Sequence, residues 1–390
     1  MHELKENQGI PRSLLLILAV VSGLSVANNY YSQPLLSAIV QDLHISELAA
    51  NHIPMMSQIG YACGLLFIIP LGDLYRRRKI ILVDFVLLIV ALLVFASAQH
   101  VYIVYAAALA TGICTVMPQV FIPIVAQFSE PVNKSRNVGL VLSGLLTGIL
   151  ASRVVSGIVG EYFGWRMIFY ISAAMMVFCF IIIYFTLPDN PSSFEGRYSE
   201  LLRSILTLIR KHPNLRISSI RAGLGFGSLL AMWASLAFKM VKAPFFAGQD
   251  IIGLLGFCGV AGALTASVAG KYTDRLGIRK MNYIGSGAIL LAWLVMFFVQ
   301  NSYIGMVFGI IIIDMGIQLI QVSNQSNVLI IDSKASNRLN TVFMTTFFIG
   351  GAFGTFLSGL CWNQWMWNGV VMAGIGLALA GLLLTVLTNE

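Results

Sequence analysis

The stretch Gly270-Lys-Tyr-Thr-Asp274-Arg275-Leu-Gly277-Ile-Arg279-Lys280 lies between two apolar runs, residues 251–269 and 281–299. A bilayer core of about 30 Å needs roughly 20 apolar residues in a helix, so each run is long enough to cross a membrane. The stretch between the runs is short, polar and rich in cations. It predicts a loop on one membrane surface that connects two membrane-spanning helices.

Apolar runs of this kind continue outward from the loop along the whole chain. Hydrophobic residues make up 58% of the sequence and charged residues only 10%, whereas a soluble domain carries about 25% charged residues. Such a chain cannot coat a globular surface with polar groups, so we predict an all-α membrane protein. Its twelve expected helices are residues 13–37, 52–71, 80–98, 102–128, 137–159, 165–187, 217–241, 251–269, 281–299, 303–330, 340–361 and 367–387.

The lysines and arginines alternate between the two predicted membrane surfaces. If the N-terminus is cytoplasmic, 20 of the 24 fall on the cytoplasmic side, and the exceptions are Arg153, Arg166, Lys239 and Lys242. Cytoplasmic loops carry such an excess of Lys and Arg. We therefore predict a multi-pass protein with both termini in the cytoplasm. The net charge of +8 has this explanation, and no nucleic-acid partner is expected.

One polar segment, residues 188–216, separates the sixth predicted helix from the seventh. It divides the chain into two six-helix bundles, residues 1–187 and 217–390. Within it, apolar residues at helical spacing alternate with cations, which indicates an amphipathic helix on the inner membrane face. A solvated linker with some helix is the alternative. The apolar residues are Leu201, Leu202, Ile205, Leu208 and Ile209.

The two bundles are related by an internal repeat at an offset of about 201 residues. Polar, glycine and tryptophan residues of the two halves match at this constant offset, and such agreement is not expected by chance. Six helices per repeat give both halves the same orientation, and such halves typically pack around an axis along the membrane normal, with the substrate site between them. The matches include Asp73 with Asp274, Gln119 with Gln321, Arg136 with Arg338, Gly148 with Gly350, and Trp165 with Trp367.

At this point the chain resembles the major facilitator superfamily over its whole length. The loop at 270–280 is similar to the family's G-x-x-x-D-R-x-G-x-R-K signature, and Gly72-Asp73-Leu-Tyr-Arg76-Arg77-Arg78-Lys79 is a partial first-half copy. Gly164-Trp165-Arg166 and Asn29-Tyr-Tyr-Ser-Gln33-Pro34 resemble bacterial members of the drug:proton antiporter branch. The resemblance implies twelve helices in two pseudo-symmetric bundles and a location in the bacterial inner (plasma) membrane.

The chain departs from that branch at several positions. The helix-four arginine is replaced by Ala108, helix five has Arg153 and no proline, and helix one carries no acid. The usual carriers of proton coupling are therefore absent or moved. The resemblance names the proton as a candidate coupling ion without the residues that usually carry it.

The signature loops are candidate cytoplasmic gates. Acids beside cations can form charge-assisted hydrogen bonds or meet the positive end of a neighbouring helix. The resemblance implies that they lock the cytoplasmic side in the outward-facing state, whereas the alternative is that the cations only set topology. The candidates are Asp73, Arg77, Arg78, Arg136, Asp274, Arg275, Arg279 and Arg338.

A polar stripe on the tenth helix marks a candidate substrate cavity. Asp314, Gln318, Gln321 and Gln325 lie on one helical face, and an unpaired amide in hydrocarbon costs about 4–8 kcal/mol. The stripe must therefore face water or polar partners, and polar packing between helices is the alternative. The resemblance implies that helices one, four, seven and ten line the cavity. The other candidates are Asn28, Asn29, Tyr31, Gln33, Thr115, Gln119, Trp233 and Asn324.

Two charges lie in the outer half of the predicted membrane core. Arg153 is on helix five and Asp314 on helix ten, and charges at such depth are costly and usually functional. We predict that they pair as an outer gate and that Asp314 carries coupling. A partner within the same half, or water, is the alternative for each.

Small-residue pairs suggest where helices approach closely. Pairs such as Gly60/Gly64, Gly144/Gly148 and Gly350/Gly354, and the series Gly253/Gly256/Gly259/Gly262, occur on helices two, five, eleven and eight. The resemblance implies that these helices form the contact between the halves. We expect the glycines to line that contact.

These features favour a secondary active transporter that moves a small organic solute by alternating access, with proton-coupled efflux as first hypothesis. A nutrient or metabolite importer of the same fold and a non-transporting sensor are the alternatives. No nucleophile–base pair, metal-ligand spacing or nucleotide-binding sequence occurs, so we expect no enzyme, cofactor or metal site. The expected partners are the substrate and the bilayer, and we expect a monomer.

Overall fold

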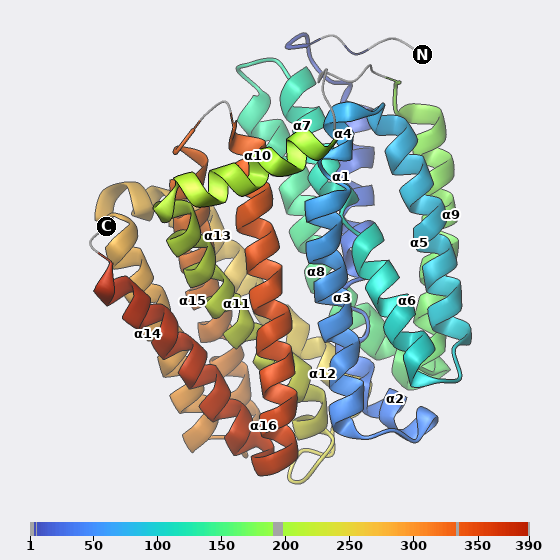
Figure 1. The fold of residues 1–390 in the computed structure, drawn as a ribbon. Helices are drawn as coiled ribbons and strands as arrows, with labels where there is room; N and C mark the ends of the chain where they lie inside the picture. Colours follow the sequence, from blue (N-terminus) through green and yellow to red (C-terminus); the bar gives the residue numbers. More distant parts are fainter. Residues whose placement is uncertain (1–3, 5, 190–197, 333–334, 389–390) are drawn as a thin grey trace.

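The computed structural model describes residues 4, 6–189, 198–332 and 335–388, without the side chain of Asp73. The described residues form helices joined by short connections, and none forms a strand. The long helices stand side by side in one bundle (Figure 1). We call the end that carries both termini the terminal side and the opposite end the distal side.

The first half contains six membrane-crossing units. Residues 28–32 interrupt the first unit and residues 115–116 the fourth, so both are broken helices. The units are α1–η1–α2 (Arg12–Ala27, Gln33–Leu35, Leu36–Leu43), α3 (Glu47–Phe67), α5 (Arg77–Ser97), α6–α7 (Val101–Cys114, Met117–Phe128), α8 (Lys134–Phe163) and α9 (Trp165–Thr186). The short α4 (Leu71–Leu74) lies in the first-half signature loop.

The second half repeats this plan. Its second unit is interrupted by a 3-10 turn, and α16 is two helices, because Trp365 and Met366 have non-helical backbone angles. The units are α11 (Pro213–Met240), α12–η2–α13 (Gln249–Leu254, Leu255–Gly259, Val260–Leu276), α14 (Ile278–Phe298), α15 (Tyr303–Leu329) and the two parts of α16 (Ser336–Leu387).

The prediction of twelve membrane helices in two halves is confirmed. Nine helices of the described residues are long and apolar enough to span a bilayer when α16 counts once. Dividing α16 at its break, and adding α3 and the interrupted α1–α2 unit, gives twelve. The helix α1 is apolar but is shorter than a full span because residues 28–32 interrupt its unit, whereas α3 is less apolar because it carries buried polar side chains such as Asn51 and Gln58.

Equivalent glycines pack the two halves internally. In α8, a Cβ on Gly148 would lie 2.2 Å from the carbonyl oxygen of Gly23 in α1. In α16, a Cβ on Gly350 would lie 2.2 Å from the carbonyl oxygen of Gly223 in α11. The repeat in the sequence therefore reappears as the same backbone contact in each half.

The expectation that the glycine pairs line the contact between the halves is wrong for most of them. Gly60 packs on α6, and Gly148 and Gly350 pack inside their own halves. Gly253 does join the halves, because a Cβ there would lie 2.5 Å from the carbonyl oxygen of Arg153. Sequence spacing detects close approach, but it does not identify the neighbouring helix.

Replacing Gly148 with alanine should destabilise the N-terminal half by about 1–3 kcal/mol, because the backbones of α1 and α8 must separate to admit the methyl group. The matched control is Gly139→Ala on the same helix, where a Cβ would meet nothing within 4 Å. Thermal unfolding of the purified variants in detergent measures the difference. Equal melting temperatures would contradict the packing role of Gly148.

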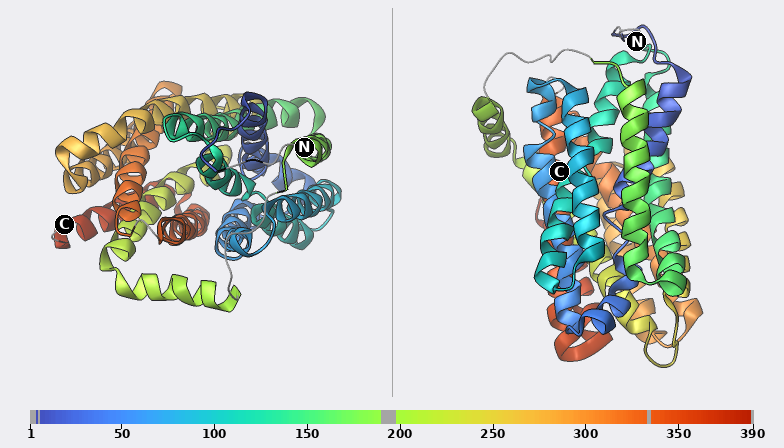
Figure 2. Two further views of the ribbon diagram at one scale, coloured as in Figure 1. Left: turned by 90° about the horizontal axis from the view of Figure 1, so that it is seen from above. Right: turned by 90° about the vertical axis from the view of Figure 1, so that its right-hand side faces the viewer.

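The halves meet through α3 against α16 and α8 against α12, which are the helices that the family resemblance implied. A separate helix, α10 (Tyr198–Lys211), lies across one edge of the bundle at a steep angle to the other helices (Figure 2). Its apolar residues Leu201, Ile205 and Leu208 are buried, and it contacts α16 and α11. The predicted amphipathic helix therefore exists within residues 188–216, of which 190–197 lie outside the described residues.

Candidate functional site

A cluster of three side chains joins the halves at the distal side. Glu47 begins α3, and its carboxylate lies 2.9 Å from the ammonium of Lys242, which follows α11. The indole nitrogen of Trp362 in α16 donates to the same carboxylate at 2.7 Å. Lys242 also lies 4.9 Å from the centroid of the Trp362 ring. We call Glu47, Lys242 and Trp362 the distal latch.

A second contact supports the closure of the distal side. The backbone N–H of Gln249, at the start of α12, donates to the carboxylate of Glu161 in α8 at 2.7 Å. One turn further in, Gly157 and Gly253 bring the two backbones together. Both ends of the distal contact are therefore fixed by polar bonds to Glu47 and Glu161 of the first half.

Arg153 lies deep between the halves and is 5% exposed. Its Nε donates to Oε1 of Gln33 at 2.9 Å. Its guanidinium carbon lies 4.1 Å from the ring centroid of Trp233 and 5.2 Å from that of Tyr30. Gln33 occupies the 3-10 turn that follows the break in helix one, and the absence of a side chain at Gly256 leaves room for Arg153.

Asp314 faces the same region from α15. Its Oδ2 is buried and has no hydrogen-bond partner among the described residues. The carboxylate and Arg153 interact electrostatically, but they form no ion pair within the described part of the chain. Arg153 instead has the within-half partner Gln33, which was the alternative. The direct Arg153–Asp314 pair stays a prediction.

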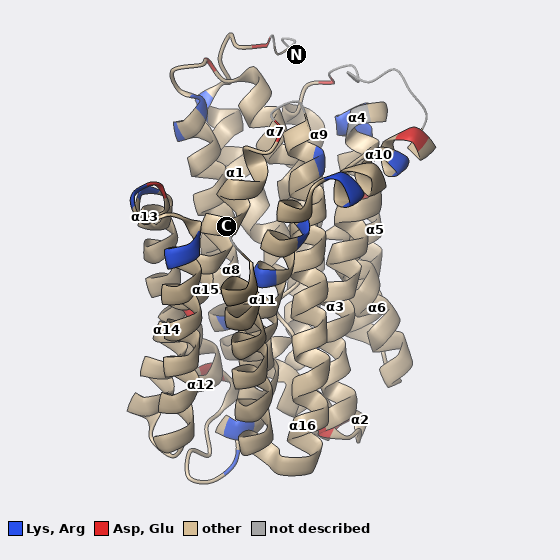
Figure 3. Ribbon diagram, turned by 60° about the vertical axis from the view of Figure 1, so that its left-hand side comes forward, with Lys and Arg blue, Asp and Glu red and all other residues tan. Residues whose placement is uncertain are grey.

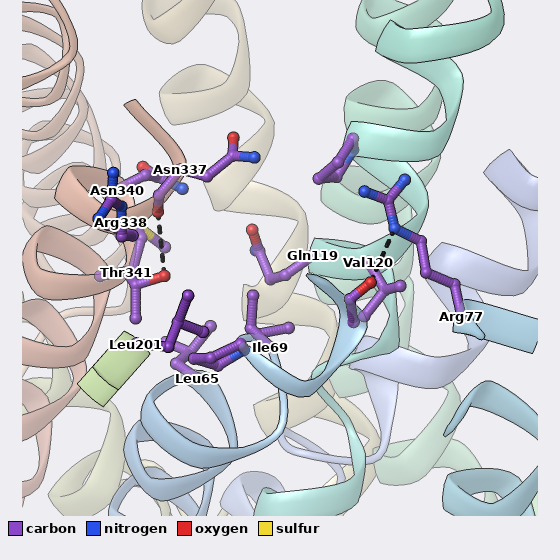
Figure 4. Close-up of a pocket in the computed structure, with 14 residues that line it drawn as sticks. Leu65, Ile69, Arg77, Gln119, Val120, Leu201, Asn337, Arg338, Asn340 and Thr341 are labelled. Atoms are coloured by element: carbon purple, nitrogen blue, oxygen red, sulfur yellow. Dashed lines mark hydrogen bonds between the residues drawn. The ribbon is translucent and has the colours of Figure 1, made fainter. Parts of the chain in front are cut away.

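On the terminal side, a pocket lies between the halves. The first half contributes Ile69, Arg77 and Gln119, and the second contributes Arg338 and Thr341, among other residues. Figure 4 shows Gln119 between Arg77 and the side chains of α16. The pocket therefore draws cationic and amide groups from both halves.

Two predicted cavity residues contact or adjoin this pocket. Gln119 lines it. Gln325 lies behind its wall, because its amide donates to Oδ1 of Asn340, a lining residue, at 2.8 Å. Gln318 and Gln321 are half-buried on the same helix, α15. The prediction that the α15 stripe touches substrate stays a prediction.

Other predicted cavity residues bond within their own halves. Asn28 donates to the backbone of Leu24 and Ser25 and accepts from Ser172 of α9. Asn324 donates to Asn282 of α14 at 2.7 Å.

The remaining cavity candidates are buried. Thr115 donates to the carbonyl of Gly112. Tyr31 and Asn29 are 3% and 1% exposed, and neither amide atom of Asn29 has a partner among the described residues.

The first-half signature cations form contacts within that half. Arg77 donates to the carbonyl of Gly72 and to Gln127, and Arg78 donates to the carbonyl of Tyr184. Arg136 lines a groove with Glu130 beside α8. The side chain of Asp73 lies outside the described residues.

In the second half, Arg279 donates to the hydroxyl of Tyr283 at 3.3 Å, and Asp274 and Arg275 are exposed. Both loops lie at the terminal side, and the first-half loop contributes Gly72 and Arg77 to the pocket. Their locking role stays a prediction.

Sequence reasoning missed the distal latch and, apart from Arg338, the α16 wall of the pocket. Lys242 was visible only as a cation outside the predicted cytoplasmic segments. Glu47 and Trp362 are 315 positions apart in the chain, so no local pattern connects them. Asn340 and Thr341 could have been found as polar residues on the eleventh predicted helix.

Residues 18–355 match the family described as Major Facilitator Superfamily. The chain belongs to the major facilitator superfamily. This major facilitator is 34% identical over 379 residues to an uncharacterized transporter, YgaY, of Escherichia coli O157:H7, covering 97% of this chain and 96% of that protein. It is 30% identical over 372 residues to the probable transporter SCO4007 of Streptomyces coelicolor, with coverages of 94% and 86%.

Solved structures of major facilitators share the fold. The nucleoside transporter NupG superposes with a TM-score of 0.74 at 16% identity, covering 96% of this chain and 97% of that one. A bacterial homologue of the human lysosomal transporter Spinster, in an inward-facing and unoccupied conformation, gives 0.71 at 14% identity, with coverages of 96% and 94%. At these identities the likeness concerns the fold alone.

Proposed function

We propose that this membrane transporter exports a small organic solute in exchange for protons by alternating access. The observation that carries the proposal is the asymmetry of the contact between the halves. They are bonded at the distal side by Glu47 and Glu161, while a pocket separates them at the terminal side. This arrangement is one of the two states that alternating access requires.

The distribution of lysines and arginines indicates which end of the bundle faces the cytoplasm. Lysines and arginines gather toward the terminal side and few lie at the distal side (Figure 3). An excess of Lys and Arg marks cytoplasmic segments. We therefore place the terminal pocket toward the cytoplasm of a bacterial cell and the distal latch outside the plasma membrane, so that this conformation accepts solute from within.

The coupling proposal rests on Asp314. An acid whose Oδ2 is buried and has no hydrogen-bond partner among the described residues can exist ionised beside Arg153 or protonated without it, so binding of a proton changes the charge between the halves. Arginine does not deprotonate in proteins and cannot carry the proton itself. Asp314 is therefore the proposed coupling acid.

Replacing Asp314 with asparagine should abolish coupling while leaving exchange of solute intact. A gradient of one pH unit drives about tenfold accumulation per exchanged proton, and we expect this factor to vanish in Asp314→Asn. The measurement is solute accumulation in proteoliposomes with an imposed pH gradient. Asp42→Asn, at a surface ion pair with Arg166, is the control. Normal pH-driven accumulation by Asp314→Asn would exclude it as the coupling acid.

The direction and class of transport need a separate experiment. Ethidium, a drug-like cation, and uridine, a nucleoside, are offered to inside-out and right-side-out vesicles with a pH gradient. Export predicts accumulation in inside-out vesicles with an acidic lumen. Uptake restricted to right-side-out vesicles would favour a nutrient importer. Specific binding without flux or counterflow would favour a sensor.

A further inference from the structure

A recess at the distal end of the second half adjoins the distal latch and is separate from the terminal pocket. Its volume is about 220 Å³. Three segments that are far apart in the chain form it: the end of α11, the connection after α14, and the break in α16. Its lining residues are Lys239, Lys242, Ala243, Gln300, Trp362, Trp365, Met366, Trp367 and Asn368.

The recess holds one cation that the protein does not neutralise. Lys242 is paired with Glu47 at 2.9 Å. Lys239 is 8% exposed, and its ammonium lies 3.4 Å from the side-chain oxygens of both Gln300 and Asn301. In the described part of the chain no carboxylate lies within ion-pair distance of Lys239. Two long bonds to neutral amides compensate a partly desolvated ammonium poorly.

The walls around this cation are fixed and aromatic. The indole nitrogen of Trp367 donates to the carbonyl of Met296 at 3.1 Å, and that of Trp362 to Glu47 at 2.7 Å. Met366 has a left-handed backbone (φ 51°), which a non-glycine residue adopts only at a cost, and this break leaves Trp365 60% exposed. The break in α16 therefore presents aromatic surface beside Lys239.

An amide lies opposite the ammonium. Nε2 of Gln300 donates to Oδ1 of Asn368 at 3.3 Å, which orients the Asn368 side chain on the rim. An ammonium with nearby amide donors and rigid aromatic walls matches an anionic oxygen group that carries an apolar portion. Such a group would form a charge-assisted hydrogen bond with Lys239 and replace its long contacts to neutral amides.

We propose that this recess is a binding site for a phosphate-type anion, held by Lys239 and bordered by Trp362, Trp365 and Trp367. The anion comes either from solution or from the headgroup of an anionic lipid, because the recess lies at the distal membrane boundary and both sources offer the same oxygens. The site is independent of the transported solute, so its test does not depend on the direction or coupling of transport.

The test uses the full-length protein in phosphatidylcholine nanodiscs and reads tryptophan fluorescence, since three of the six tryptophans line the recess. Inorganic phosphate and phenyl phosphate are the titrants. We expect saturable responses in the wild type and in Lys239→Arg, and binding weaker by about tenfold or more in Lys239→Gln, as for the loss of one charge-assisted hydrogen bond. Lys271→Gln, an exposed cation of the terminal side, is the matched control.

A second arm identifies the source of the anion. In nanodiscs that contain phosphatidylglycerol, a lipid ligand would occupy the recess and suppress the phosphate response of the wild type, whereas a soluble ligand would leave it unchanged. Either result supports the site. Identical titrations of the wild type and Lys239→Gln, or no response to phosphate together with no difference between the two lipids, overturn it. Lys239→Arg guards against loss of folding, since it keeps the charge.

Discussion

Replacing Glu47 with glutamine is expected to open the distal side of this transporter. The carboxylate of Glu47 accepts bonds from Lys242 and Trp362, both of the second half. A partly exposed ion pair contributes about 0.2–1 kcal/mol, and a hydrogen bond to a charged group about 1.5–3 kcal/mol. Because both bonds connect the halves, their weakening should shift the equilibrium between the two states toward distal opening by about tenfold.

The shift can be measured beneath the latch. Asn51 is 1% exposed, and its side chain lies against Gly359 of α16. In a background without the five native cysteines, Asn51→Cys should react with a membrane-impermeant maleimide in whole cells about tenfold faster when Glu47→Gln is present. The control is Glu130→Gln, the same change in a carboxylate that bonds only to Asn133 of its own half among the described contacts.

A charge exchange tests whether the Glu47–Lys242 bond itself matters. Glu47→Lys and Lys242→Glu should each accelerate labelling, and the two together should slow it again. If the labelling rate of Asn51→Cys is the same in all these backgrounds, the distal latch does not hold the distal side closed.

The fold could be predicted because its determinants are periodic in the sequence. The length of each apolar run predicts a membrane-spanning helix, and the placement of the cations predicts which loops lie on the cytoplasmic side. The constant offset that relates Asp73 to Asp274 and Gly148 to Gly350 predicts the division into two related halves. The breaks at residues 28–32 and 255–259 were not predicted. Glycine and asparagine permit a break, but tertiary packing decides whether one occurs.

The site was predictable only where polarity conflicts with the membrane. Arg153 and Gln33 were each selected because such side chains need a reason to lie in hydrocarbon, and Trp233 because the family resemblance implied that its helix lines the cavity. Their assembly into one cluster was not predicted, because it depends on how α1, α8 and α11 meet. The role of Tyr198 in α10 was also invisible: its hydroxyl donates to the carbonyl of Phe67, and so ties α10 to the end of α3.

Replacing Arg153 with methionine should have a larger effect on distal closure than Glu47→Gln. The guanidinium bonds Gln33 of the first half and also stacks on Trp233 of the second. A desolvated cation–π contact contributes about 2 kcal/mol or more, and a charge-assisted hydrogen bond about 1.5–3 kcal/mol. Their loss should reduce the population of the distally closed state by about a hundredfold.

The expected readouts are faster labelling of Asn51→Cys from outside and loss of solute accumulation. Arg166→Met is the matched control, because Arg166 also stacks on a tryptophan, Trp165 at 4.3 Å, and pairs with a carboxylate, Asp42. That cluster belongs to the first half alone. Arg166→Met should therefore lower the melting temperature at most, without changing the labelling rate.

The effect of Arg153→Met has two interpretations, which differ in the partner that the guanidinium serves. If the guanidinium serves mainly to compensate Asp314, Arg153→Met leaves an uncompensated buried acid, and adding Asp314→Asn should restore both the melting temperature and distal closure. If it serves mainly to join Gln33 to Trp233, the double variant should regain stability but stay open at the distal side. The 2.9 Å bond to Gln33, the 4.1 Å stack on Trp233 and the absence of an ion pair with Asp314 among the described residues favour the second result. Full restoration of closure by Asp314→Asn would assign Arg153 to charge compensation instead.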